Sequence, residues 1–352
     1  MIRVGFLSGV RHAASYVPLL AADPRVELVG VGEADDAPAW MRDDTRRLAE
    51  RFELPLLPLA ELLHPARCDV LVVCSEPTRH AALAVAALEA GCHVLVDKPV
   101  AVSVSEADRI LEAEERSAGT ASVINRLRSP AVRRLRSSVD AGHFGLPRHV
   151  DVEWFASGAF FSTSVERPEL VTDVALSGGG ELLNFLLYPV DYVRYLTGLE
   201  VVEAYAETAT LFQEAHAAAG VEDSAVVSLL LENGVTATIT LGRVASAPGL
   251  GPVSSTVRLI GSRGFATSDD DRPAVALYDR DGRLHERPFG GPSSDAIVAS
   301  FLDGYIGDLV AGRRPEYGVR DARAALEVTE ACAIAARTGE PTRLNRNTRG
   351  EG

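Results

Sequence analysis

Lys98 stands out for the chemistry it could do, because it is the only lysine in a chain whose other strongly basic side chains are arginines. It follows Val94–Val96, an apolar run typical of a buried parallel strand, and lies in the segment Asp97-Lys98-Pro99. Ligands of open α/β sheets bind beyond the carboxyl ends of the strands, and a lysine can give up its proton whereas an arginine effectively cannot. Lys98 is therefore a candidate proton-transfer residue. The alternative is a surface lysine that packs only its methylene stem on the fold.

A second set of polar residues follows the glycines Gly178–Gly180, which would let a loop approach a ligand closely. Asn184, Tyr188 and Asp191 are spaced i, i+4 and i+7, so one helix would carry them on one face among apolar neighbours. Tyr188 could donate a proton to a carbonyl oxygen, and a nearby Lys98 ammonium would lower the pKa of its phenol. The alternatives are a buried hydrogen-bonded network and a half-buried tyrosine with a satisfied hydroxyl.

The stretch Ser8-Gly9-Val10-Arg11-His12-Ala13 follows the first predicted strand, where the pyrophosphate of a dinucleotide would bind. Backbone N–H groups and the dipole of the next helix favour that negative charge. Of the G-x-G-x-x-G/A fingerprint only Ala13 matches, and Val10 puts a β-branched side chain where the backbone should approach phosphate. Arg11 could compensate by binding phosphate itself. The alternative is a nucleotide-like turn that no longer binds. The candidate cofactor residues here are Ser8, Gly9, Val10, Arg11 and His12.

Glu33 comes directly after the second predicted strand, within Gly32-Glu33-Ala34-Asp35-Asp36. A carboxylate at this strand end would bind the diol of the adenosine ribose and would repel a 2′-phosphate. No arginine or lysine follows until Arg42. The sequence therefore favours NAD over NADP, and the alternative is a solvated acidic loop.

Short apolar runs alternate with amphipathic ones in the first third of the chain, which predicts βαβ units and a parallel sheet covered on both faces. Gly91 is the expected stop of one helix. The predicted strands are Ile2–Leu7, Val26–Val31, Leu54–Leu57, Asp69–Val73, Val94–Val96 and Ala121–Ile124, with helices over 12–22, 37–51, 78–90 and 103–118.

Longer alternating runs follow residue 148 and predict a large, mostly antiparallel open sheet mixed with helices over 181–197 and about 292–338. Asn233-Gly234 is a hairpin signal, and Pro189 should bend its helix. Residues 345–352 should form a frayed tail. The predicted strands are Arg148–Trp154, Val201–Thr210, Ser224–Leu231, Val235–Leu241, Thr256–Ile260, Ala274–Tyr278 and Leu284–Arg287.

The composition limits the class of protein. The 352 residues carry 35 Lys and Arg against 49 Asp and Glu, a formal charge of −14, and 47% are hydrophobic. Such a chain should form about two globular domains, and its acidic balance disfavours nucleic acid and anionic membranes. The chain contains no uncharged apolar run of ~18 residues, which is the length that could span a membrane. We expect a cytoplasmic protein, because no secretory signal opens the chain and its four cysteines lack a C-x-x-C pair.

Three stretches together resemble the glucose-fructose oxidoreductase / inositol dehydrogenase / rhizopine-catabolism (Gfo/Idh/MocA) family: Ala81–Pro99, Ser177–Gly198 and the ending from Phe301 to Pro341. The resemblance implies a dinucleotide-binding Rossmann domain over residues 1–121 and an α+β domain over 122–344, whose open sheet often mediates dimers or tetramers. It also implies NAD(P)-dependent oxidation or reduction of a sugar, a cyclitol or a related carbonyl compound.

The resemblance suggests residue functions and three departures, the first of which is the glycine fingerprint eroded to Ser8-Gly9-Val10. Asn184 stands where the family has a catalytic aspartate, and Tyr188 stands where it has a histidine, as in the branch that includes glucose-fructose oxidoreductase and dihydrodiol dehydrogenases. Asparagine cannot act as an acid or base but can orient a hydroxyl. His80 matches a family histidine that is structural or adjacent to the cofactor. The implied cofactor residues also include Ser75, Pro77, Asp97 and Lys98, and the implied substrate residues are Asn125, Arg126 and Trp154.

We therefore expect an oxidoreductase that moves a hydride between the nicotinamide and a carbinol carbon, with no metal ion. Lys98 and Tyr188 would relay the hydroxyl proton, while Asn184 and Asp191 would orient the substrate. One alternative is an enzyme that retains its cofactor and catalyses epimerisation or elimination through a transient ketone. The other is a redox-inactive binding or regulatory relative. The loop Phe155–Arg167, which would select the substrate, carries no diagnostic motif.

Overall fold

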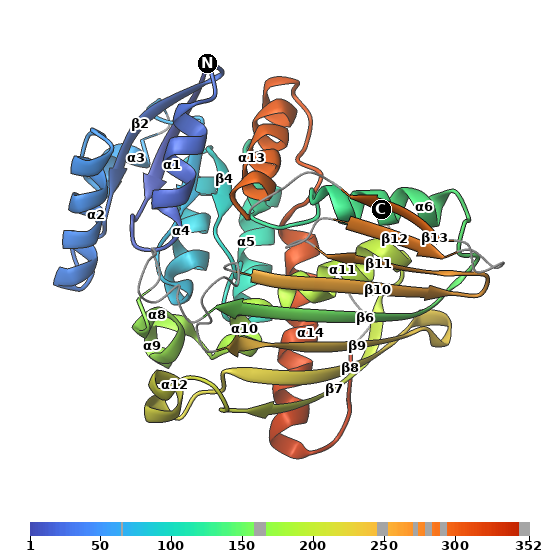
Figure 1. Cartoon of the computed structure of the whole chain (residues 1–352). Helices are drawn as coiled ribbons and strands as arrows, with labels where there is room; N and C mark the ends of the chain where they lie inside the picture. The colour runs from blue at the N-terminus through green and yellow to red at the C-terminus, as the bar shows by residue number, and fades with distance from the viewer. Residues whose placement is uncertain are drawn as a thin grey trace. The chain divides into compact units, whose positions relative to one another are not determined.

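The computed structural model describes residues 1–64, 66–157, 167–244, 253–269, 274–278, 284–288 and 294–344. The chain forms two compact units (Figure 1). The first unit comprises Met1–Asn125, Phe161–Gly178 and Val298–Leu326, and the second comprises Arg126–Phe160, Gly179–Ile297 and Glu327–Gly352. The predicted domain boundary between residues 121 and 122 stays a prediction, and the predicted tail over 345–352 lies outside the described residues.

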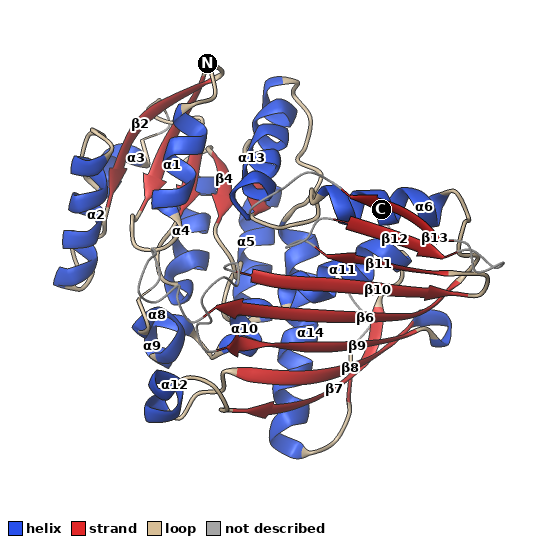
Figure 2. Ribbon diagram, in the orientation of Figure 1, coloured by secondary structure: helices blue, strands red, loops and turns tan. Residues whose placement is uncertain are grey.

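The first unit contains a five-stranded parallel sheet in the order β2-β1-β3-β4-β5, with helices between its strands (Figure 2). The predicted parallel sheet is therefore confirmed. Its strands are β1 (Ile2–Leu7), β2 (Val26–Gly32), β3 (Val70–Val73), β4 (His93–Val96) and β5 (Ala121–Val123). Its helices are α1 (Ala13–Ala21), α2 (Ala39–Arg51), α3 (Leu59–Leu62), α4 (Pro77–Glu89), α5 (Val104–Arg116), α8 (Glu169–Thr172), α9 (Val174–Ser177) and most of α13 (Ser294–Val310).

One predicted strand of this unit is wrong. Leu54–Leu57 forms no strand, and only an isolated parallel bridge joins Leu56 to Val31. Pro55 and Pro58 flank the bridge, and proline has no N–H to donate to a ladder, so the pairing cannot extend. The predicted helix stop at Gly91 is confirmed, since α4 ends at Glu89 and Gly91 has a φ of +81°.

The core of the first unit lies between the sheet and its helices. Phe6 of β1 and Leu95 of β4 belong to the same buried cluster as Tyr16 and Val17 of α1. Phe301 and Tyr305 of α13 complete the cluster and stack with their ring centroids 6.4 Å apart. This packing holds the carboxyl ends of β1, β2, β3 and β4 at one edge of the sheet.

The second unit contains a nine-stranded sheet in the order β13-β12-β11-β10-β6-β9-β8-β7-β14, in which all neighbours are antiparallel except β6 and β9. The predicted, mostly antiparallel sheet is thus confirmed. Its strands are β6 (Pro147–Ser157), β7 (Val201–Ala209), β8 (Ser224–Leu231), β9 (Thr236–Val244), β10 (Val253–Gly261), β11 (Phe265–Asp269), β12 (Ala274–Tyr278), β13 (Leu284–Pro288) and β14 (Thr342–Arg343).

Helices cover one face of this sheet, and they include α6 (Pro130–Asp140), α10 (Glu181–Phe185) and α11 (Leu187–Thr197) (Figure 2). The short α12 (Glu214–Ala219) lies between β7 and β8, and α14 (Val319–Thr338) contains the division between the two units. Alternate residues of β8 are buried and exposed, as a half-covered sheet requires. The hairpin between β8 and β9 turns at Asn233 and Gly234, both with positive φ, as their types predicted.

Candidate functional site

Lys98 lies two residues beyond the end of β4, at the edge where the other parallel strands of the first unit also end. Only 4% of Lys98 is exposed, and the neighbouring Asp97 is fully buried. The main-chain N–H of Asp97 donates to the carbonyl of Val73 on the adjacent strand. The alternative of a solvated surface lysine therefore does not fit the burial of this residue.

Asp97 ties the loop after β1 to the strand end that carries Lys98. Its carboxylate accepts a hydrogen bond from the hydroxyl of Tyr16 and contacts Nδ1 of His12, both at 2.7 Å. The guanidinium Nε of Arg11 lies 3.6 Å away as an ion pair. Burial alone would raise the pKa of Asp97, but the charge and hydrogen bond of His12 and the charge of Arg11 outweigh it. The pKa is therefore lowered well below its ordinary value, and Asp97 is ionised at neutral pH.

The loop Ser8–His12 has an unusual backbone for a dinucleotide-binding turn. Ser8 adopts a left-handed conformation with a φ of 73°. A Cβ on Gly9 would lie 2.8 Å from Cδ2 of Leu48 and 3.1 Å from Cα of Thr45, so α2 approaches this residue closely. Val10 is buried in a small cluster with Met41 and Leu170. The β-branched side chain at Val10 thus packs into the protein interior.

Glu33 follows β2, and its side chain is only 5% exposed. The hydroxyls of Ser8 and Thr45 donate to its Oε2 at 2.5 and 3.2 Å. The N–H of Ala34 and the guanidinium of Arg79 donate to its Oε1 at 2.9 and 3.0 Å. These bonds use the four acceptor positions of a carboxylate, so the alternative of a solvated acidic loop does not apply. A ribose diol would have to replace the Ser8 or Thr45 hydroxyl.

The residues at the start of α4 support the same strand ends. Both ring nitrogens of the fully buried His80 lie near main-chain carbonyls, 2.6 Å from that of Pro99 and 2.9 Å from that of Ser75. Burial lowers the pKa of His80. Pro77 begins α4, and Arg79 bridges Glu33 to Glu76. His80 therefore connects the turn after Lys98 to the end of β3.

A groove of about 600 Å³ runs beside the Ser8–His12 loop, between the start of α1 and one face of α2. We name it the arginine groove, because Arg11, Arg47, Arg51 and Arg167 line it together with a single acidic residue, Asp44. Asp44 forms ion pairs with Arg47 and, at 2.8 Å, with Arg167. The lining remains positive in a chain of net charge −14. No acidic residue lies in the first turn of α1, so the positive end of its dipole reinforces this field.

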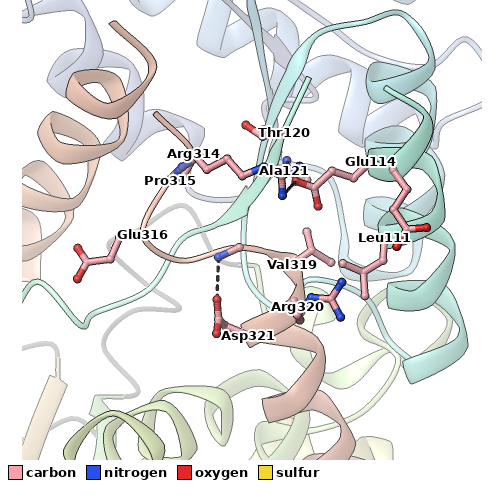
Figure 3. Close-up of a pocket in the computed structure, with 12 residues that line it drawn as sticks. Leu111, Glu114, Thr120, Ala121, Arg314, Pro315, Glu316, Val319, Arg320 and Asp321 are labelled. Atoms are coloured by element: carbon pink, nitrogen blue, oxygen red, sulfur yellow. Dashed lines mark hydrogen bonds and ion pairs between the residues drawn. The ribbon is translucent and has the colours of Figure 1, made fainter. Parts of the chain in front are cut away.

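A second cavity of about 240 Å³ in the first unit has a mixed lining (Figure 3). Asp321 accepts a hydrogen bond from the N–H of Gly318 at 3.0 Å. The charged lining residues are Glu114, Glu115, Glu316 and Asp321 together with Arg314 and Arg320. The cavity lies at the amino end of β5, near Thr120 and Ala121. It is therefore at the sheet edge opposite to Lys98, Glu33 and the loop after β1.

In the second unit, three of the predicted residues come together. The ring of Tyr188 on α11 lies 4.8 Å, centroid to centroid, from that of Trp154 on β6. The guanidinium carbon of Arg126 lies 5.1 Å above the same Trp154 ring. Trp154 is buried, and within the described residues its indole N–H has no hydrogen-bond partner. Ser255 lies directly opposite Trp154 on β10, and within the described residues its buried hydroxyl also has no hydrogen-bond partner. No spacing in the sequence pointed to this residue.

The predicted helix over 181–197, which Pro189 was expected to bend, is divided into α10 and α11 at Leu186. Pro189 has no N–H for the carbonyl of Phe185, and its ring clashes with that carbonyl in a regular helix. Asn184 consequently lies on α10, whereas Tyr188 and Asp191 lie on α11. Asp191 is buried, with Nη1 of Arg194 at 4.0 Å.

Asn184 contacts a buried charged group that the sequence did not single out. Its Nδ2 donates to Oε2 of Glu181 at 2.7 Å, and Glu181 also binds His216 and Arg243. His216 and Arg243 lie on α12 and β9, and only the fold brings them to α10. Asn125 is buried in the first unit, where its Nδ2 donates to the carbonyl of Val123 at 3.2 Å.

The predicted residues thus form two groups. One group lies at the carboxyl edge of the parallel sheet in the first unit and comprises Ser8–His12, Glu33, Ser75, Pro77, His80, Asp97 and Lys98. The other group lies in the second unit and comprises Tyr188, Asn184, Asp191, Arg126 and Trp154. The meeting of Lys98 with Tyr188 in one site stays a prediction. In the described part of the chain, no helix is long and apolar enough to cross a membrane.

Comparison with known proteins identifies both halves of the chain. Residues 2–124 match the family model "Oxidoreductase family, NAD-binding Rossmann fold", and residues 132–267 match the "GFO/IDH/MocA C-terminal domain". The uncharacterized oxidoreductase YrbE of Bacillus subtilis is 30% identical over 230 residues, or 65% of this chain and 63% of that protein. The myo-inositol 2-dehydrogenase of Thermotoga maritima is 28% identical over 228 residues, or 63% of each chain. The matches thus span less than two thirds of these two relatives.

A solved structure shares the whole fold. The crystal structure of GenD2 from gentamicin A biosynthesis, in complex with NAD, has a TM-score of 0.78 and 22% sequence identity. The match covers 98% of this chain and 96% of that one. With a five-stranded parallel sheet, a large open sheet and two matching family models, the chain belongs to the Gfo/Idh/MocA oxidoreductase family.

Proposed function

We propose that this protein is an NAD(P)-dependent oxidoreductase that transfers a hydride between the nicotinamide and a carbinol or carbonyl carbon of a sugar, a cyclitol or a related small molecule. The family supports the reaction type, and relatives named inositol and UDP-N-acetylglucosamine dehydrogenases support the substrate class. The observation that carries the proposal is the buried Lys98, whose strand end is tied through Asp97 to the loop after β1.

The residues of the first unit fit a dinucleotide, though by a different route from the glycine fingerprint. The N–H groups of Ser8, Gly9 and Arg11 are already bound to Gly32, Thr45 and Cys74. A diphosphate would therefore depend on the start of α1 and on the guanidinium groups of the arginine groove. When bound, the nicotinamide supplies a carbon that accepts or gives up a hydride.

Glu33 supports NAD rather than NADP as the cofactor. Its carboxylate is held in place by Ser8 and Thr45, whose hydroxyls a ribose diol could replace one for one. A 2′-phosphate would meet a buried negative charge at the same point. Arg79 is committed to both Glu33 and Glu76, so its charge is shared between two carboxylates.

Proton transfer would belong to Lys98 and Tyr188. A neutral Lys98 amine or a Tyr188 phenolate would take the proton of the substrate hydroxyl as the hydride leaves, and would return it in reduction. Asn184 and Asp191 would orient the hydroxyls, and the buried indole N–H of Trp154 would donate to a further oxygen. His80, Ser75 and Pro77 would hold the turn that carries Lys98.

We propose a homodimer or homotetramer in a reducing, cytoplasmic compartment. The uncovered face of the large sheet carries the exposed apolar residues Val226, Leu230, Ile260 and Phe265, and exposed apolar surface of this kind suits a contact between subunits. The four cysteines are all buried and free, which suits a compartment that keeps thiols reduced.

The test of the function combines binding with turnover. Calorimetry of the wild type should give micromolar affinity for NAD, and a panel of polyols, sugars and cyclitols should give formation of reduced nicotinamide. Lys98→Ala should lower kcat by about 10²–10⁴-fold, while the conservative Lys98→Arg, which keeps the charge but cannot release a proton, should not rescue it.

Three other outcomes would contradict this function. Retained cofactor with product formation but no net reduced nicotinamide would indicate epimerisation or elimination. An absence of NAD binding would indicate a redox-inactive relative. Equal turnover by the wild type and Lys98→Ala would remove Lys98 from the chemistry.

A further inference from the structure

Glu181 is a fully buried carboxylate directly after the three glycines, at the start of α10. It is bound by side chains from two distant elements, with Nε2 of His216 at 3.1 Å and the guanidinium of Arg243 closer still. Burial alone would raise the pKa of Glu181, but the charge of Arg243 and the hydrogen bonds from His216, Arg243 and Asn184 outweigh it and lower the pKa. Glu181 is therefore ionised at neutral pH.

The charge of Glu181 determines how the amide of Asn184 is oriented. An ionised carboxylate can only accept hydrogen bonds, so the Asn184 group that lies 2.7 Å from it must be the NH₂. The amide oxygen of Asn184 consequently faces the other way. Asn184 can offer only an acceptor on that side, which suits a hydroxyl that donates its proton.

Glu181 also explains why residue 184 is an amide. A carboxylate in place of the Asn184 amide would put an oxygen within hydrogen-bond distance of Oε2 of Glu181, with no proton between them. Two carboxylates that share a buried site cannot both ionise, and one pKa rises strongly. The other titratable groups around Glu181 are His216 on α12, Arg243 on β9 and Glu222, whose carboxylate accepts from the N–H of Leu182 at 3.2 Å.

We propose that Glu181, held by Arg243 and His216, is a positioning residue that turns the Asn184 amide so that its oxygen, rather than its NH₂, faces away from Glu181 and accepts a hydrogen bond from a substrate hydroxyl. This inference rests on the proposed function, because it assigns Asn184 to the substrate. It limits the polar group at this point to a donor, which a sugar or cyclitol hydroxyl supplies and a ketone oxygen or an ether oxygen does not.

The first arm of the experiment needs no substrate. The free energy of unfolding of the wild type, Asn184→Asp and the double variant Glu181→Gln/Asn184→Asp is measured in urea between about pH 4 and 8, around the ordinary carboxyl pKa and above it. In Asn184→Asp the folded-state pKa of one of the two carboxyl groups at positions 181 and 184 is raised. The stability of the variant should therefore match that of the wild type best at low pH, and it should fall as the pH rises through that raised pKa. The double variant has a single carboxylate, so this loss should disappear.

The matched control is Glu222→Gln, which removes a partly buried carboxyl beside the same helix without touching Asn184. Glutamine can still accept from the Leu182 N–H through its side-chain oxygen. Combined with Asn184→Asp, it should leave the pH-dependent loss in place. A loss of stability in Asn184→Asp that does not vary with pH, or one that Glu222→Gln removes as well as Glu181→Gln does, would overturn the contact on which the proposal depends.

The second arm measures turnover on whichever substrate the panel identifies. Glu181→Gln should lower kcat/KM about tenfold, the equivalent of one hydrogen bond, because a glutamine lets the Asn184 amide turn round. The double variant should recover activity above either single variant, since its one carboxylate accepts from the substrate hydroxyl. A double variant that restores stability but not activity would make the cluster merely structural and overturn the positioning function.

The two arms separate this inference from the proposed function. If the wild type neither binds NAD nor turns over any substrate, the proposed function is contradicted. The dependence of the unfolding free energy of Asn184→Asp on pH still tests the Glu181 contact in that case. Should Glu181→Gln fail to fold with Arg243 left unpaired, Asn184→Asp alone retains Glu181. Its pH-dependent loss then supports the contact, and a flat profile overturns it.

Discussion

Asp97 is the residue on which the loop after β1 depends most. Its buried carboxylate is bound by the hydroxyl of Tyr16 and by His12, with the charge of Arg11 nearby. These partners lie on the loop and on α1, whereas Asp97 lies at the end of β4. The residue next to the predicted proton-transfer lysine therefore connects the end of β4 to the loop after β1 and to α1.

We predict that Asp97→Asn lowers the free energy of unfolding by about 3–5 kcal/mol at pH 7, because it leaves the Arg11 guanidinium buried beside a neutral group. The folded-state pKa of Asp97 is depressed. The stabilisation is therefore fully present above the ordinary pKa of about 3.9 and is lost as the pH falls from there toward the lower folded-state value. Urea unfolding at a series of pH values measures the difference.

The control for this prediction is Asp36→Asn, which changes an exposed aspartate in the loop after β2. It should alter the unfolding free energy by no more than about 0.5 kcal/mol. Equal effects of Asp97→Asn and Asp36→Asn at pH 7 would show that the contacts of Asp97 contribute nothing specific.

At the scale of elements, α1 and α2 together make the arginine groove beside a loop that has lost most of its glycines. Arg47 and Arg51 lie on the face of α2 that lines the groove, whereas the neighbouring Arg46 pairs with Asp43 and does not line it. The α2 backbone also approaches Gly9 closely, because a Cβ there would lie 3.1 Å from Cα of Thr45. The packing of α2 thus leaves, beside the loop, a groove whose lining is charged and contains several arginines.

We predict that Arg47→Ala weakens NAD binding by about 5- to 30-fold, which corresponds to the 1–2 kcal/mol of a charge-assisted hydrogen bond in a partly exposed site. The loss should shrink as salt is added, because screening reduces the attraction in the wild type. Calorimetric titration at low and high salt measures both effects.

Arg46→Ala is the matched control, since it removes the same charge from the adjacent residue of the same helix. It should leave the affinity for NAD within about twofold, because Arg46, although exposed and paired like Arg47, does not line the arginine groove. If the two variants bind NAD equally well at low salt, the arginine groove does not hold the cofactor.

At the scale of the whole molecule, the large sheet leaves one face uncovered. Cross-strand pairing places Phe265, Ile260, His149, Thr236 and Leu230 in one row across five strands of that face. Three residues of this row are apolar, and each of the five strands already pairs with a neighbouring strand on both sides. An association through this face would bury side chains and would not need to extend the sheet.

We predict that the wild type is a dimer or tetramer and that Leu230→Glu shifts it toward the monomer, because the charge would be buried against apolar side chains of a second subunit. Light scattering after size-exclusion chromatography measures the mass. Leu211→Glu is the control, since Leu211 is 70% exposed and lies outside the strands. A monomeric wild type, or dissociation by Leu211→Glu alone, would contradict the assignment of this face.

Most of the elements follow from local sequence patterns. The parallel sheet of the first unit, the stop at Gly91 and the hairpin at Asn233-Gly234 depend on residues a few positions apart, so alternation, glycine and turn chemistry identify them. Pro189 predicted a disturbed helix, and the structure shows the division at Leu186 that its ring requires. The pattern missed α6 and the short, polar β11, and it took the proline-flanked Leu54–Leu57 for a strand.

Tertiary structure alone decided which side chains hold the site residues. His12 lies 85 positions from Asp97, and Arg243 lies 62 positions from Glu181, so no spacing rule connects them. Lys98 and Glu33 could be chosen from the sequence because parallel strands place their carboxyl ends at one edge. The partners of Glu181 and Asp97 could not, because helix packing and strand order bring them together, and these depend on contacts distributed over the whole chain.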